Sequence, residues 1–102
     1  MELKEVIFTS NLPTIDLHGY DRDYARVKVL EFINDNKRMK NDVICIVHGI
    51  GTGKVKDVVH KTLKSSKDVL DYQLFYNNIG CTIAKLKKNE KNVWQKSLKV
   101  LI

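Results

Sequence analysis

Proline and long apolar runs are scarce in this sequence, which has one proline and five glycines among 102 residues. That scarcity excludes a flexible linker, a low-complexity tract and an internal repeat, and the length fits one domain with one hydrophobic core. No apolar run approaches the roughly 20 residues of a membrane-spanning helix, and the first residues lack the layout of a signal peptide. We therefore expect a cytoplasmic protein with no membrane partner.

Cysteine is also rare. The two cysteines, Cys45 and Cys81, lie in separate apolar runs, and their positions match neither a zinc site nor a disulfide framework. Both are expected to be small buried hydrophobic side chains in a reducing compartment.

Acidic residues are the minority among the charged side chains. Twelve Asp and Glu oppose 18 Lys and Arg, which gives a net charge of +6 and a pI near 9.4. A basic balance of this size makes binding to a polyanion such as nucleic acid a sensible hypothesis. Lys37, Arg38, Lys40 and the lysines of the second predicted helix (residues 54–65) could form a track for backbone phosphates. The alternative is an ordinary solvated, lysine-rich surface.

Hydrophobic spacing predicts four strands and two helices. The strands are expected at 14–18, 43–47, 69–76 and 79–86, and the helices at 22–39 and 54–65. Asp21 is placed to cap the first helix, and the apolar run 43–47 is typical of a central strand. Asn77 and Asn78, which tolerate positive φ, are expected to form the tight turn between the last strands. The predicted order of elements is therefore β-α-β-α-β-β, which indicates an α/β chain.

Two terminal segments flank this predicted domain of residues 14–86. Residues 1–13 are expected to be an N-terminal extension. Residues 87–102 are rich in lysine and place Trp94, Leu98 and Leu101 at helical spacing, which predicts a basic C-terminal helix packed on the core.

The topology brings two polar segments together. Strands 14–18 and 43–47 are joined by a helix, so a right-handed crossover makes them parallel and puts their carboxyl ends at one edge of the sheet. His18 and His48, 30 positions apart, stand at these two ends. The sequence therefore predicts one site built from both segments.

The first segment contains Asp16 and His18, which alternate with Ile15 and Leu17 in a strand-like run. Alternation along a strand puts both polar side chains on one face, about 7 Å apart along the backbone. The sequence does not decide whether the two side chains form a direct hydrogen bond. Histidine titrates near neutral pH and a carboxylate can orient it, which suits acid/base catalysis. Taken alone, the segment is better explained by an Asp16 that caps a turn and a His18 that stacks at the sheet edge. The second segment reverses that preference.

The second segment runs from His48 to Lys56 and places three alternating glycines between an apolar strand and a basic helix. Such a loop lets the backbone approach an anion at a helix N-terminus. It is not a Walker loop, because Val55 replaces the magnesium-binding hydroxyl, and it lacks the last glycine of a dinucleotide fingerprint. The residues expected to bind nucleic acid are His48, Gly49, Gly51, Gly53, Lys54 and Lys56.

Together the two segments resemble the signatures of the Smr (small MutS-related) domain family, which occurs at the C-terminus of bacterial MutS2 proteins and as stand-alone proteins. Ile15 to Gly19 matches the family's Leu-Asp-Leu-His-Gly motif, and His48 to Gly53 matches its His-Gly-x-Gly-x-Gly motif. Where the family continues with leucine and arginine, this chain has Val55 and Lys56, so a bidentate phosphate contact becomes a point charge. Of the family's glycine-rich turn before the last strand, Gly80 remains.

The resemblance implies an α+β two-layer fold, with two helices on a mixed four-stranded sheet, similar to the C-terminal domain of bacterial translation initiation factor three. It implies nucleic-acid binding, often with endonuclease activity on DNA or RNA. It also implies that Asp16 and His18 take part in cleavage and that the glycine segment binds substrate. No cofactor is firmly implied. Asp16, His18 and His48 could hold a divalent metal ion, although their spacing selects none.

Two alternatives to a nuclease stay open. One is a non-catalytic module that binds structured nucleic acid or the ribosome, and the other is a protein-interaction domain that uses the tail around Trp94. Two further side chains are ambiguous. Tyr20 could stack on a base or pack on the first helix, and His60 is expected to be a surface histidine away from both segments.

Overall fold

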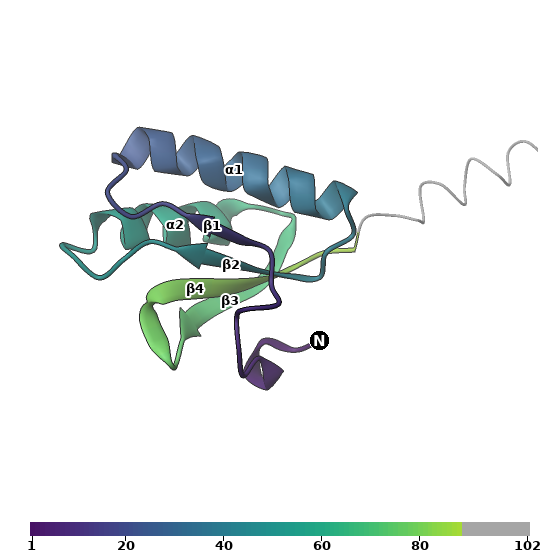
Figure 1. Cartoon of the computed structure of the whole chain (residues 1–102). Coiled ribbons are helices and arrows are strands. Elements are labelled where there is room, and N and C mark those ends of the chain that lie inside the picture. The colour runs from purple at the N-terminus through teal and green to yellow at the C-terminus, as the bar shows by residue number, and fades with distance from the viewer. Residues whose placement is uncertain (89–102) are drawn as a thin grey trace, which may run out of the picture.

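The computed structural model describes residues 1–88 as a four-stranded sheet with two helices on one side (Figure 1). Its elements are the 3-10 turn η1 (Leu3–Glu5), β1 (Thr14–Asp16), α1 (Arg22–Arg38), β2 (Val43–Val47), α2 (Lys54–Ser65), β3 (Val69–Phe75) and β4 (Asn78–Leu86). This order confirms the predicted fold class. The predicted C-terminal helix lies outside the described residues, apart from the first two positions of its segment.

The strand order in the sheet is β1-β2-β4-β3, so β2 is an interior strand, as predicted. β1 runs parallel to β2 with Ile15 opposite Ile46, and β4 runs antiparallel to both β2 and β3. The parallel pair puts the carboxyl ends of β1 and β2 at the same edge of the sheet. Figure 1 shows the loops that follow these two strands at the same end of the molecule.

The helices and the sheet enclose the larger of two hydrophobic cores. It contains Leu17, Ala25, Val29, Ile33, Ile44, Ile46, Val59, Leu63, Ala84 and Leu86. Both helices contribute residues at the predicted helical spacing, and removal of each large aliphatic side chain from water stabilises the fold by about 1.5–3 kcal/mol. Within residues 1–88, no helix is both long and apolar enough to cross a membrane.

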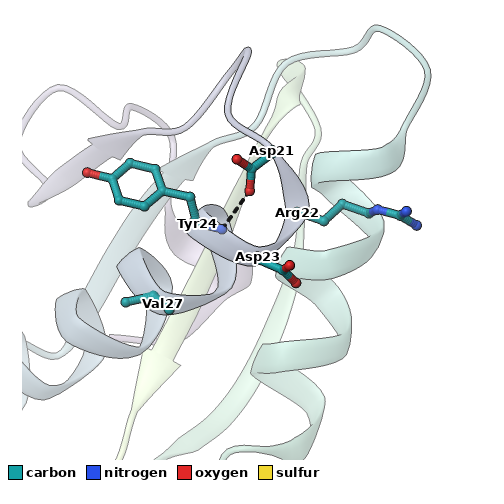
Figure 2. A pocket seen from close by; sticks show the side chains of 5 residues that line it. All are labelled: Asp21, Arg22, Asp23, Tyr24 and Val27. Atoms are coloured by element: carbon teal, nitrogen blue, oxygen red, sulfur yellow. Dashed lines mark hydrogen bonds between the residues drawn. The ribbon is translucent and has the colours of Figure 1, made fainter.

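The ends of α1 have local causes. The Asp21 carboxylate accepts the N–H of Tyr24 at 2.9 Å, which is the predicted N-cap (Figure 2). The helix ends at Arg38, one residue before the predicted end, and Lys40 follows with a left-handed φ of +63°. A residue in that conformation cannot continue a right-handed helix.

The sheet face opposite the helices is covered by the N-terminal segment, which the sequence presented only as an extension. The second core contains Leu3, Val6, Val43, Cys45, Phe75, Cys81 and Ile83. Glu2 also accepts a hydrogen bond from Lys85 of β4 at 2.9 Å. Figure 1 shows η1 on the side of the sheet away from the helices. The segment is therefore an integral part of the fold.

Both cysteines lie in this second core and are buried, as predicted. Burial, with the Cys81 thiol close by, raises the pKa of Cys45 to about 11. Cys45 is therefore a protonated, unreactive thiol near neutral pH.

The turn between β3 and β4 falls on Tyr76 and Asn77, and Asn78 is already the first residue of β4. The tight turn predicted at Asn77 and Asn78 is therefore displaced by one residue, and neither asparagine uses its tolerance of a positive φ. The strand pairing shifts instead between Leu74 and Phe75, and Phe75 lies opposite Asn78. This irregularity lets the strands join without a left-handed turn residue.

Candidate active site

Asp16 and His18 form a hydrogen-bonded pair at the end of β1. The strand ends at Asp16, and the N–H of the buried Leu17 donates to the carbonyl of Val47 at 2.7 Å. Oδ1 of Asp16 lies 2.6 Å from Nδ1 of His18 and also accepts the backbone N–H of His18 at 3.1 Å. The separation of about 7 Å expected of a continuous strand does not apply, because the strand stops before His18. Asp16 therefore caps the turn after β1 and also contacts the His18 imidazole.

The pair has a defined electrostatic arrangement. The hydrogen bond from the His18 ring, followed by that from the His18 backbone, lowers the pKa of Asp16, so the carboxylate stays ionised. An ionised carboxylate only accepts hydrogen bonds, so Nδ1 of His18 carries the hydrogen and Nε2 is left for a substrate. The His18 side chain is 71% exposed. An accessible imidazole oriented by a carboxylate is suited to proton transfer.

The loop between β2 and α2 is built on three glycines with positive φ. Gly49, Gly51 and Gly53 have φ values of +82°, +24° and +83°, which residues with side chains rarely adopt. Gly53 is the N-cap of α2 and provides no side-chain cap for the first N–H groups of the helix. These N–H groups and the helix dipole favour an anion at this point.

A pocket of about 400 Å³ joins the two segments. It is lined by His18, Gly19 and Tyr20 from the first segment and by every residue from His48 to Lys56 from the second. The structure thus brings the two segments together at one edge of the sheet, as the topology predicted. Asp16 does not line the pocket but contacts it through His18.

The His48 ring is held inside the protein. His48 is only 4% exposed, its Nδ1 lies 2.8 Å from the Gly49 carbonyl oxygen, and its Nε2 lies 2.8 Å from Oγ1 of Thr82. Because both nitrogens are engaged, a direct contact of this ring with phosphate would break one of these bonds. The backbone N–H groups of His48 and Gly49 both donate to the Gly80 carbonyl, at 2.9 and 3.0 Å. Gly80 of β4 therefore anchors the base of the glycine loop.

Thr82 joins His48 to His60, and the prediction that His60 lies away from both motifs is wrong. Nε2 of His60 is 2.7 Å from Oγ1 of Thr82, and the two histidine rings are 5.9 Å apart between centroids. The Gly49 carbonyl accepts from Nδ1 of His48, so Nε2 of His48 accepts the Thr82 hydroxyl hydrogen. The Thr82 oxygen then accepts from His60. The signal in the sequence was Thr82 itself, a hydroxyl inside an apolar strand that needs buried partners.

The stability of the protein is expected to fall when the pH is lowered through the range in which histidine titrates. Burial is the largest cause that lowers the pKa of both His48 and His60 below the ordinary value of 6.5. Unfolding restores the ordinary pKa, so below about pH 6.5 the unfolded chain binds protons that the folded chain does not. Because solvent partly screens His60, we expect a loss of about 1 kcal/mol or less in the free energy of unfolding on going from about pH 7.5 to about pH 5.5.

Urea unfolding at several pH values measures this effect. His60→Gln, which removes one of the two titrating groups, is expected to flatten the dependence. Stability that is constant or rises on acidification over this window would contradict the role given to His48 and His60.

Gly49→Ala is expected to disturb His18 as well as the loop. A Cβ at Gly49 would lie 3.2 Å from Cβ of His18, whereas one at Gly53 would have no neighbour within 4 Å. Both glycines have nearly the same φ, so the backbone strain of about 1–2 kcal/mol should be common to both alanine variants. Urea unfolding should show this shared loss, while the NMR signals of the His18 ring should shift only in Gly49→Ala. Equal shifts in both variants would mean that Gly49 does not position His18.

The structure does not assemble a metal site from the predicted residues. Within residues 1–88 there is no group of three or more His, Cys, Asp or Glu side chains that could hold one ion. Of the three candidates, Asp16 and His18 contact each other, whereas both ring nitrogens of His48 are engaged elsewhere.

Comparison with known proteins identifies relatives of this arrangement. The family model for the Smr domain matches residues 15–87. Endonuclease MutS2 of Brevibacillus brevis is 32% identical over 76 residues, and that of Lactobacillus helveticus is 34% identical over 76 residues. Each alignment covers 72% of this chain but 10% of the relative, so the chain spans about a tenth of the length of these curated relatives.

Two solved structures share the fold. The Smr domain of Thermus thermophilus MutS2 superposes with a TM-score of 0.72 at 20% identity, covering 74% of this chain and 99% of that one. YdaL, a stand-alone small MutS-related protein from Escherichia coli, superposes with a TM-score of 0.70 at 21% identity, covering 74% of this chain and 64% of that one.

Proposed function

Because the chain belongs to the Smr domain family, we propose that it binds nucleic acid and cleaves its phosphodiester backbone. The observation that carries the proposal is the Asp16–His18 pair at the edge of a pocket formed by the glycine loop. The MutS2 relatives are named endonucleases, which supports the same chemistry.

In this proposal His18 is the acid/base group and Asp16 orients it. Nε2 of His18 takes a proton from the attacking water or hydroxyl group, whose oxygen forms a bond to phosphorus. The bond from phosphorus to the leaving oxygen breaks, the leaving oxygen takes a proton from water, and His18 returns its proton to the solvent afterwards. Asp16, kept ionised by its hydrogen bonds, stabilises the imidazolium that forms.

The glycine loop would hold the phosphate during this step. The N–H of Lys54, the first of α2, donates to Oγ1 of Thr52 at 3.4 Å. The next N–H groups of the helix and the ammonium groups of Lys54 and Lys56 would contact the non-bridging oxygens, on which charge accumulates. In this arrangement His48 lines the pocket and supports the loop from inside, through the hydrogen bond of its ring to the Gly49 carbonyl.

A cleavage assay tests the proposal. The chain is incubated with single-stranded RNA, single-stranded DNA, and nicked and branched DNA, with and without a chelator. We expect strand scission by the native chain on at least one of these polymers, and none by the Asp16→Ala/His18→Ala double variant. Equal scission by both proteins would assign the activity to a contaminant or to other residues.

The second candidate is a module that binds nucleic acid or the ribosome without cutting. The basic charge and the two lysines in the pocket favour binding, whether or not chemistry follows. The candidate predicts tight, salt-sensitive binding with no scission in the same assay.

Lys54→Ala and Lys56→Ala are each expected to weaken binding of duplex DNA and to reduce the slope of log K against log salt by about 0.9 for each phosphate that the variant no longer neutralises. Lys4→Ala removes the same charge from an exposed position on η1, across the sheet, and is the matched control. Fluorescence anisotropy over a salt series gives both quantities. A slope that changes as much in Lys4→Ala would mean that the pocket lysines act only through net charge.

A further inference from the structure

Two tyrosines stand in ring contact beside the pocket. The Tyr20 and Tyr24 ring centroids are 5.0 Å apart with a tilt of 37° between the planes. Tyr20 is 39% exposed and Tyr24 is 48% exposed, so both rings present surface to solvent. Two adjoining exposed aromatic rings form a surface suited to binding, because such rings can bury much apolar area at a small cost in side-chain entropy.

The pair connects two hollows on the surface. Tyr20 lines the pocket that contains His18 and the glycine loop. Tyr24 lines a second, open hollow of about 630 Å³ at the start of α1, together with Asp21, Arg22, Asp23 and Val27 (Figure 2). Because the two rings are in contact, the tyrosine pair spans from the hollow at the start of α1 to the pocket that contains the glycine loop.

The two tyrosines are not equivalent. Nζ of Lys28 lies over the Tyr24 ring, 5.5 Å from its centroid, so Tyr24 already has a cation as well as the Tyr20 ring as neighbours. Tyr20 is the ring that reaches the pocket. Its backbone is fixed by the turn after β1, where its N–H donates to the Leu17 carbonyl at 3.1 Å. Tyr20 therefore lines the pocket from a fixed backbone position, with the Tyr24 ring as its aromatic neighbour.

We infer that Tyr20 is a stacking platform for an unpaired nucleobase of a strand whose phosphate is held by the glycine loop, and that Tyr24 positions its ring. The inference rests on the proposed function and narrows its substrate to single-stranded or locally unpaired nucleic acid. Aromatic rings bind bases of any sequence by stacking, but only bases that are not already stacked inside a duplex are available. The adjacent lysines and helix N-terminus supply the complementary contact to the backbone phosphate.

The test uses the full chain and a short oligonucleotide, made as RNA and as DNA, that contains the fluorescent adenine analogue 2-aminopurine. Stacking quenches this base, and stopped-flow mixing reads both binding and quenching before cleavage accumulates. We expect Tyr20→Ala to weaken binding of the single strand by about fivefold or more and to abolish the quenching. Tyr20→Phe keeps the ring and should behave as the native chain, and Tyr24→Ala should give a smaller loss.

Three controls separate stacking from other effects. Phe8→Ala removes an exposed aromatic ring from the N-terminal segment and should leave binding unchanged. Tyr20→Leu keeps apolar bulk without an aromatic face, so it should bind as weakly as Tyr20→Ala while unfolding at the native temperature. A fully paired duplex of the same sequence should bind equally to the native chain and to Tyr20→Ala.

Native affinity and native quenching in Tyr20→Ala would overturn the platform and leave the proposed function standing. Failure of the native chain to bind either RNA or DNA would overturn the proposed function and, with it, the platform. Equal loss of duplex and single-strand binding in Tyr20→Ala would also overturn the preference for unpaired bases.

Discussion

Replacement of His18 by alanine is expected to lower the rate of strand cleavage by about two to four orders of magnitude, the range that a positioned acid/base group contributes. The variant removes Nε2 of His18, which is left for the substrate because the other ring nitrogen, Nδ1, is bonded to Asp16. The side chain is 71% exposed and outside both cores, so the free energy of unfolding should change by no more than about 0.5 kcal/mol. The loss therefore belongs to catalysis and not to folding.

Asp16→Asn refines this prediction. The amide keeps the shape of the side chain but removes the negative charge that stabilises the imidazolium, so we expect an intermediate loss of about tenfold to a hundredfold. Single-turnover cleavage rates measure the loss of catalysis, and the affinity for the uncleaved strand, measured separately, shows any loss of substrate binding. Both variants should bind substrate nearly as well as the native chain. Native cleavage rates in a folded His18→Ala protein would remove His18 from the mechanism.

Thr82→Val is expected to cause the largest loss of stability, about 2–3 kcal/mol in the free energy of unfolding. Valine fills the same volume, so the core remains packed, but the hydroxyl that joins the two histidine rings is lost. Nε2 of His48 then has no partner at a site that is almost fully buried, and an unsatisfied buried polar group costs about 1–3 kcal/mol. His60 also loses its hydrogen-bond partner, but its ring is only partly buried, so water can replace part of the lost bond.

Two controls accompany Thr82→Val in urea unfolding. Thr62→Val makes the same change at another buried threonine, whose hydroxyl donates only to the Val58 carbonyl, and should cost less than about 1 kcal/mol. Thr82→Ser keeps the hydroxyl and should retain most of the stability. Equal losses in Thr82→Val and Thr62→Val would show that the bridge between the histidines contributes nothing beyond an ordinary hydrogen bond.

The elements that were predicted correctly are those with a local signal. The helical spacing of Ala25, Val29 and Ile33 and the apolar run of β2 were sufficient for α1 and the interior strand. The handedness of the first crossover then brought both motifs to one edge, which is why the composition of the pocket could be anticipated. The cap at Asp21 is local in the same sense.

The features that were missed depend on contacts between distant parts of the chain. Nothing local marks residues 1–13 as the cover of a sheet face, since only the full sheet creates the surface that Leu3 and Val6 bury. His60 meets His48 only because α2 packs over β4, and neither position signals the other. The 2.6 Å contact between Asp16 and His18 depends on where β1 stops, and strand ends are the least predictable feature of a sequence.

The covered sheet face also determines how this protein can be dissected. The family match starts at residue 15, so a fragment trimmed to that boundary would lose Leu3 and Val6 and expose an apolar surface on β2 and β4 to water. Bare apolar strands of this kind associate with one another. Precipitation of a trimmed fragment would thus reflect the loss of this covering segment and would say nothing about whether the edge that carries Asp16 and His18 is intact.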